Sequence, residues 1–248
     1  INVTELDEKN YHEMIVHVPM AYKLNAKKAL IIGGGDGGTA RELLKYKNLD
    51  ITMIEIDKVV IEAAKLHLPS TAISYQNPRL NLIIDDGAKF IKNYSGEKFD
   101  IIIVDSTDFN RAIVLFTKEF YTNIFNNLKE DGVLVFNNDS VVNDEHSLIL
   151  NPTNQLKKIF KFVFPYQLFM PSYYSGHYTM MFCSKTIHPI NTKVNSKTIG
   201  KDEIFKIFSN YVSEILKPLE KNLKNIDQNK PSVILIAGVN GVGKTTTI

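Results

Sequence analysis

Carboxylate side chains recur where apolar runs of the sequence end. Asp36 follows "ALIIGGG", Glu55 closes "ITMIE", Asp86 follows "LNLIID", and Asp105 and Asp108 lie in "IIIVDSTD". Carboxylates bind cations, accept hydrogen bonds and can take a proton from a reacting group. Several carboxylates at one place repel one another unless a cation lies among them. The pattern therefore predicts a cation site, for a metal ion or for an organic ammonium or sulfonium.

A glycine-rich loop precedes the first of these acids. Gly33, Gly35 and Gly38 have the G-x-G-x-x-G spacing, and Glu55 follows by about 20 residues, where a carboxylate can bind a ribose diol. Asp36 would repel the pyrophosphate of a dinucleotide, so the loop favours a cationic nucleoside such as an S-adenosyl sulfonium compound. The alternative is a tight turn in which Asp36 caps the next helix and Glu55 is an exposed side chain. Because a nucleoside explains Glu55 without a metal, we expect no metal site.

Strand-like and helix-like segments alternate through residue 185. We predict strands at 27–32, 50–57, 79–85, 99–105 and 132–137, closing strands at 166–170 and 178–184, and helices at 39–47, 58–68, 87–94, 117–132 and 152–163. Apolar strands alternating with helices indicate an α/β fold with a mostly parallel sheet, of the Rossmann-like methyltransferase type, and helices on both faces. The carboxyl ends of parallel strands share one edge, so the acids above should converge there.

Composition restricts the class of protein. The 248 residues are 44% apolar and 23% charged with a net charge of +2, which gives no indication of a nucleic-acid partner. No apolar run reaches the ~20 residues that cross a bilayer. The single Cys183 excludes an internal disulfide, and we assign it to the core. We expect a cytoplasmic protein.

Seven motifs in order over residues 5–185 resemble the polyamine aminopropyltransferase family, which includes spermidine synthase. They are "YHEMIVHVP", "IIGGGDGGTARELLK", "MIEIDKVVIEAAKLHLP", "PRLNLIIDDGAKFI", "FDIIIVDSTD", "LFTKEFY" and "PSYYSGHYTMMFCSK". The resemblance implies transfer of an aminopropyl group from decarboxylated S-adenosylmethionine, as co-substrate, to a diamine, usually putrescine. It also implies a homodimer or homotetramer.

The resemblance also implies roles for single residues. Asp105 would be the proton acceptor, and Asp108 would bind the ammonium of the acceptor. The remaining substrate-binding residues would be Glu55 at the ribose, Asp86 with Gly87 at the adenine, Asp36 at an amine, and His12 and Tyr173 in orienting the amine.

Two departures from the family pattern matter. Phe109, Asn110 and Arg111 replace the proline- and glycine-containing stretch that gates the site in relatives, so the family pattern alone does not fix the acceptor. The family's N-terminal β-rich domain is not found before residue 1, so we expect a fragment.

The C-terminal region has a different character. Residues 186–201 read as a linker and 202–248 as a helix, a strand and a phosphate-binding loop, in which Gly238, Gly243, Lys244 and Thr245 fit G-x-x-x-x-G-K-[ST]. This stub resembles the start of a signal-recognition-particle receptor-type GTPase. The switch and guanine-reading segments are missing, so we expect no hydrolysis and hypothesise that two coding sequences were joined.

Three rival functions stay open at this point. The core could be an S-adenosylmethionine-dependent methyltransferase, since the architecture would be shared. The chain could be a truncated signal-recognition-particle receptor-type GTPase, or a nucleoside-binding domain without activity.

Overall fold

The computed structural model describes residues 4–106, 113–138, 152–173 and 175–192. All of these belong to one unit of the chain, Ile1–Asn195. The predicted stub at 202–248 lies outside the described residues, as do most of the predicted linker and the segment 107–112.

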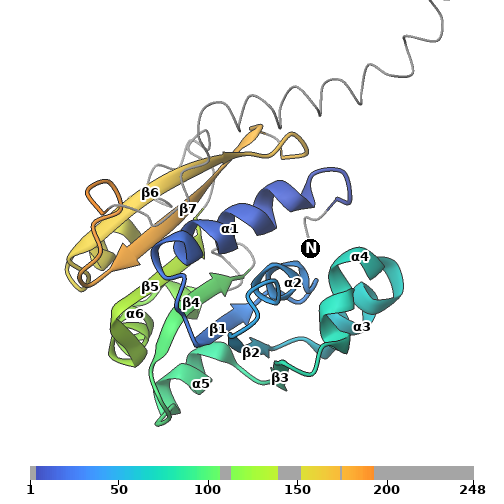
Figure 1. Cartoon of the computed structure of the whole chain (residues 1–248), viewed down its shortest axis with the longest axis horizontal. Coiled ribbons are helices and arrows are strands. Elements are labelled where there is room, and N and C mark those ends of the chain that lie inside the picture. The colour runs from blue at the N-terminus through green and yellow to red at the C-terminus, as the bar shows by residue number, and fades with distance from the viewer. Residues whose placement is uncertain (1–3, 107–112, 139–151, 174, 193–248) are drawn as a thin grey trace, which may run out of the picture. The chain divides into compact units, whose positions relative to one another are not determined.

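The described residues form a seven-stranded sheet in the order β3-β2-β1-β4-β5-β7-β6 (Figure 1). Five strands are parallel: β1 (Lys28–Gly33), β2 (Asp50–Glu55), β3 (Leu80–Ile84), β4 (Phe99–Asp105) and β5 (Leu128–Asn137). The hairpin of β6 (Phe162–Phe169) and β7 (His177–Ser184) joins β5 in antiparallel orientation. The chain order reverses between β1 and β4, where open α/β sheets bind their ligands.

Helices cover both faces of the sheet. They are α1 (Glu8–Tyr22), α2 (Gly38–Leu43), α3 (Lys58–His67), α4 (Pro69–Ala72), α5 (Gly87–Asn93) and α6 (Lys118–Asn127), with a short helical turn at 152–156 and 3₁₀ turns at Ile73–Gln76 and Ile113–Phe116. Alternate strand residues point to opposite faces. Ala29 and Ile31 of β1 pack in the core with α1 and α2, whereas Leu30 and Ile32 pack in the core with α5 and α6. The predicted α/β class with helices on both faces is confirmed.

Several elements differ from the sequence prediction, and the clearest differences concern three segments. Helix α1 was not predicted, although buried Tyr11, Ile15 and Val16 recur at helical spacing. Helix α6 ends at Asn127 rather than at residue 132, because Leu128 adopts extended backbone and begins β5. In the predicted helix 152–163, only 152–156 is helical, and Phe162 already pairs with Ser184 of β7.

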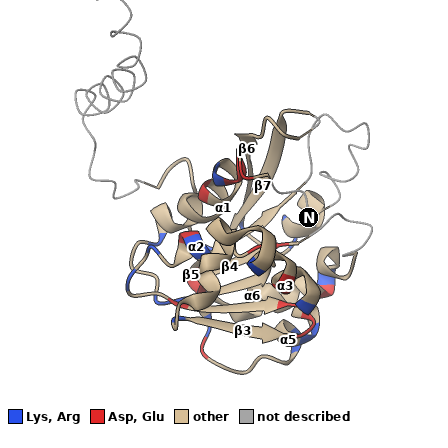
Figure 2. Cartoon of the chain, turned by 90° about the vertical axis from the view of Figure 1, so that its right-hand side faces the viewer, with Lys and Arg blue, Asp and Glu red and all other residues tan. Residues whose placement is uncertain are grey.

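Charged residues of both signs are interspersed over the elements in Figure 2, in keeping with the small net charge. None of the helices in the described part of the chain has the length and apolar character that a membrane-spanning segment requires.

Candidate active site

The loop between β1 and α2 places backbone at the carboxyl edge of the sheet. Gly33, Gly34 and Gly37 adopt positive φ angles of 89°, 74° and 89°, which L side chains rarely adopt. A Cβ atom at Gly33 would also lie 2.1 Å from the carbonyl oxygen of Asp105 on neighbouring β4. The left-handed positions Gly34 and Gly37 lie outside the predicted G-x-G-x-x-G set.

The other two predicted glycines provide space for side chains. A Cβ atom at Gly35 would lie 2.8 Å from the Glu55 carboxylate, and one at Gly38 would lie 2.2 Å from the His12 ring. Neither glycine has a positive φ angle. Their small size therefore lets Glu55 and His12 approach the loop.

Asp105 ends β4 with two hydroxyl donors on its carboxylate. The Tyr11 hydroxyl donates to Oδ1 at 2.7 Å, and the Thr39 hydroxyl donates to Oδ2 at 2.6 Å. Burial raises the pKa of Asp105, and the nearby charge of Asp36 raises it further. A carboxylate oxygen has a second lone pair, so each can still accept a hydrogen bond from a substrate. A carboxylate with a raised pKa is suited to accept a proton.

His12 supplies a positive charge inside the acidic cluster. Its Nδ1 lies 2.5 Å from Oε2 of Glu8, and its Nε2 lies 3.2 Å from Oδ1 of Asp36, an ion-pair separation without hydrogen-bond alignment. Burial alone would lower the pKa of His12, but contacts with Asp36 and Glu8 raise it to about 10. His12 is therefore an imidazolium at neutral pH. Asp36 also accepts a hydrogen bond from the backbone N–H of Gly38 at 2.6 Å, so the predicted alternative, a local cap, coexists with this ion pair.

Glu55 and Tyr75 complete the edge next to the loop. The Glu55 carboxylate is buried and accepts a hydrogen bond from the Asp57 N–H at 2.9 Å, and burial raises its pKa. The Tyr75 hydroxyl donates to the Gly35 carbonyl at 2.9 Å. Burial raises the pKa of Tyr75, and so do the charges of Asp36, Glu55 and Asp105. These three carboxylates are therefore close enough together to act on one tyrosine.

Asp86 and Gly87 lie at the start of α5. The Asp86 carboxylate accepts hydrogen bonds from the N–H groups of Ala88 and Lys89, at 2.8 and 3.1 Å, and caps the helix. A Cβ atom at Gly87 would lie 2.3 Å from Cγ2 of Ile32, so this glycine lets α5 pack on the end of β1. Both residues have structural tasks, and their role at an adenine stays a prediction.

Aromatic rings connect Tyr173 to the acidic cluster. Tyr173 stacks edge-on against Tyr178 with centroids 5.1 Å apart, and Tyr178 lies 6.1 Å from the ring of Tyr11. Tyr11 in turn donates to Asp105. Tyr173 therefore lies on the side of the site that the β6–β7 hairpin contributes.

Several predicted residues cannot be placed. Asp108, the gate residues Phe109, Asn110 and Arg111, and the loop residues Gly238, Gly243, Lys244 and Thr245 lie outside the described residues. Their roles stay predictions. Across the described ranges, no group of three His, Cys, Asp or Glu side chains is arranged to hold a metal ion.

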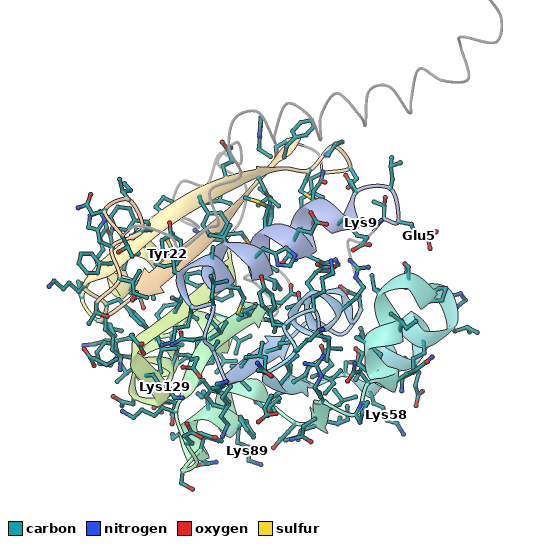
Figure 3. All side chains as sticks on the ribbon, viewed as in Figure 1. Glu5, Lys9, Tyr22, Lys58, Lys89 and Lys129 are labelled. Carbon is teal, nitrogen blue, oxygen red and sulfur yellow. The ribbon has the colours of Figure 1, made fainter. Side chains whose placement is uncertain are left out.

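The sequence reasoning missed four residues that hold the site together: Glu8, Tyr11, Thr39 and Tyr75. Helix α1 crosses over the sheet with Lys9 near its start and Tyr22 near its end (Figure 3). Glu8, Tyr11 and His12 are buried at three- and four-residue spacing. The three- and four-residue spacing of these side chains was the signal available in the sequence.

The chain is similar to known proteins. The family model described as the spermine/spermidine synthase domain matches residues 8–195. A polyamine aminopropyltransferase of Alkaliphilus metalliredigens is 47% identical over 193 residues, which cover 77% of this chain and 68% of the relative. A polyamine aminopropyltransferase of Clostridium perfringens is 41% identical over 232 residues, which cover 88% of this chain and 82% of the relative.

Solved structures give the same result. A crystal structure of spermidine synthase from Thermotoga maritima has a TM-score of 0.71 and 36% identity, covering 87% of this chain and 77% of that one. A spermidine synthase in complex with the transition-state analogue AdoDATO has a TM-score of 0.72 and 36% identity, covering 87% and 78%.

Proposed function

The chain belongs to the spermine/spermidine synthase family, and from this premise we propose that it makes spermidine from putrescine, with Asp105 as the proton acceptor. The transferase class predicted from the motifs, polyamine aminopropyl transfer, is confirmed by the family match and the relatives. The acceptor and the roles of individual residues are the proposal.

The donor is decarboxylated S-adenosylmethionine, the co-substrate of spermidine synthases, and its sulfonium nucleoside suits the loop after β1. Glu55 would accept hydrogen bonds from the ribose diol, because it is buried beside Gly35 with an ionisable carboxylate. Asp36 would face the aminopropyl ammonium. An ordinary S-adenosylmethionine carries a carboxylate at this end, which Asp36 would repel.

The reaction needs an unprotonated amine. An alkyl ammonium has a pKa near ~10, so putrescine arrives with both nitrogens protonated. Asp105 would take one proton from the attacking nitrogen. That nitrogen then forms a bond to the aminopropyl carbon next to sulfur while the carbon–sulfur bond breaks. Sulfur leaves with the bonding pair as the neutral thioether 5'-methylthioadenosine, so no acid is required.

One observation carries this assignment: Asp105 is half-buried, holds two hydroxyl donors and has a raised pKa beside Asp36. Because the pKa of Asp105 is raised, it lies closer to the pKa of the amine, and the proton transfer is less unfavourable. The two hydroxyl donors fix the carboxylate in one orientation.

The test is an assay of the full chain with decarboxylated S-adenosylmethionine and putrescine. We expect spermidine and 5'-methylthioadenosine in equal amounts, and we expect Asp105→Asn to lower kcat by about 10²–10⁴-fold. Asp50→Asn is the matched control, because Asp50 is exposed at the opposite end of a parallel strand. Unchanged kcat in Asp105→Asn would remove Asp105 from this role.

A second set of assays, with other donors and acceptors, identifies the substrates. Ordinary S-adenosylmethionine should give no methylated amine, and longer triamine acceptors should react more slowly than putrescine. Methylated product without spermidine would instead support the methyltransferase reading. The predicted oligomer and cytoplasmic location stay proposals of the same kind.

A further inference from the structure

Glu8 is a buried carboxylate that no step of the proposed reaction uses. Its Oε2 lies 2.5 Å from Nδ1 of His12, one helical turn away on α1. Arg41 of α2 donates to both of its oxygens at 2.9 Å. Two cationic partners lower the pKa of Glu8 to about 2 against the effect of burial, which raises it. Glu8 is therefore ionised at every pH at which the enzyme could work.

The contact with Glu8 fixes the orientation of His12. The ring is fully buried, Gly38 lies against its edge where any Cβ would clash, and Tyr11 packs against it edge-on at 5.4 Å. With Nδ1 held by Glu8, Nε2 lies 3.2 Å from Oδ1 of Asp36. A ring held this way has little freedom to turn, so Nε2 stays beside Asp36.

We propose that Glu8 is a positioning residue that acts through His12: it keeps His12 as an imidazolium facing Asp36 and so sets the charge that Asp36 and Asp105 present to the amine. This inference rests on the proposed function for its catalytic consequence. Its physical core, a His12 cation maintained by Glu8, does not.

The charges around His12 determine the direction of the effect. Removal of the Glu8 charge should lower the pKa of His12, because one of its two contacting anions is lost. A neutral His12 would no longer lower the pKa of Asp105, so Asp105 would stay protonated to higher pH. The groups that face the ring are Glu8 and Tyr11 from α1, Asp36 from the β1–α2 loop and Asp105 from β4, with Arg41 of α2 behind Glu8.

Glu8→Gln tests the inference, and Glu42→Gln is its matched control. Glu42 is as deeply buried as Glu8 and also binds Arg41, but its other partners are His17 and Lys45 rather than His12. Both variants lose a buried anion of the same network, so both should lose stability. Only Glu8→Gln should change the titration of His12.

The measurement is an NMR titration of the His12 imidazole in the full chain without substrate, together with the pH profile of kcat. In the wild type we expect His12 to stay protonated to near its pKa of about 10. Glu8→Gln should lower that midpoint by about 1–3 pH units and move the acid limb of kcat to higher pH. Glu42→Gln should change neither.

Two results would overturn the inference. One is a His12 midpoint that is the same in Glu8→Gln and wild type, or moved equally by Glu42→Gln. The other needs no variant, and so holds even if Glu8→Gln fails to fold: a wild-type His12 that titrates near ~6.5, as in a model peptide. Failure of the proposed function is a separate result, namely a wild type that makes no spermidine while His12 titrates as expected.

Discussion

At the scale of single residues, the site contains a carboxylate whose charge destabilises the folded state. Asp105 is half-buried near Asp36, and both its desolvation and that neighbour raise its pKa above the ordinary value. An acid with a raised folded-state pKa contributes stability at low pH that is lost as pH rises through that pKa. At neutral pH the ionised Asp105 is therefore a cost to folding.

This cost leads to a prediction for Asp105→Asn that goes beyond loss of activity. The amide is neutral and can still accept from Tyr11, so the variant should unfold at higher urea concentration than wild type at neutral pH, by about 0.5–2 kcal/mol. The exposed Asp50→Asn should leave the midpoint in place. A less stable Asp105→Asn would mean that its bonds to Tyr11 and Thr39 outweigh the repulsion.

Gly38→Ala is the second prediction at this scale. The new methyl carbon would lie 2.2 Å from the fully buried His12 ring, which is too close for any real contact, so the ring must shift away from its position beside Asp36. We expect a loss of about 1–3 kcal/mol in unfolding free energy and a higher KM for putrescine. Gly96→Ala is the control, because its methyl would meet only the tip of the Tyr94 side chain in an exposed turn. Wild-type KM in Gly38→Ala would contradict this account.

Single residues were predicted from the sequence to different degrees. Acids at strand ends were found because buried apolar runs mark the strands, and parallel strands bring their ends together. Glu8 and Thr39 were not found, because their importance comes from contacts with His12 and Asp105 that only the fold creates. Asp36 shows why two readings stayed open: one carboxylate both caps locally and pairs with His12.

At the scale of elements, α1 connects the two sides of the site. Asp7, the residue just before α1, holds the turn of the β6–β7 hairpin, since it accepts hydrogen bonds from the Ser172 N–H and hydroxyl at 2.8 and 2.9 Å. The inner face of α1 carries Tyr11 and His12. The helix therefore fixes Tyr173, next to Ser172, relative to Asp105.

Asp7→Ala should loosen this connection. Two hydrogen bonds to a buried carboxylate are lost, so we expect about 1–3 kcal/mol less stability and a KM for putrescine that rises more than kcat falls. Asn10→Ala removes a weaker, exposed contact to the same hairpin, the 3.2 Å bond to the Phe169 carbonyl, and serves as the control. Equal KM values in the two variants would show that Asp7 does not position Tyr173.

The elements themselves were predicted best where both faces of a strand are buried. Strand β4 was predicted at 99–105 and found at Phe99–Asp105, because a continuous apolar run fits a parallel strand covered on both faces. The segments around Leu128 and Phe162 were assigned to helices because their apolar spacing fits either period. Both segments are strands because they pair with β4 and with β7. These pairings join residues far apart in the sequence, so local spacing does not reveal them.

At the scale of the whole molecule, the Glu8–His12 pair makes stability depend on pH at both ends of the range. The pKa of Glu8 is lowered from 4.5 to about 2, so its contribution is present above pH 4.5 and is lost as pH falls toward 2. The pKa of His12 is raised from 6.5 to about 10, so its contribution is complete below pH 6.5 and is lost as pH rises toward 10. Together the two contributions are complete only between pH 4.5 and 6.5.

We therefore expect the unfolding free energy of the wild type to fall between pH 6.5 and about 10, by an amount on the order of a few kcal/mol. His12→Gln should remove most of this slope, because glutamine does not titrate. His17→Gln is the matched control: His17 lies one and a half turns further along α1 and is part-exposed beside Glu42. Urea unfolding across this interval measures all three chains. If His12→Gln and wild type lose stability in parallel while His17→Gln flattens the curve, the buried cation at the centre of the site is not His12.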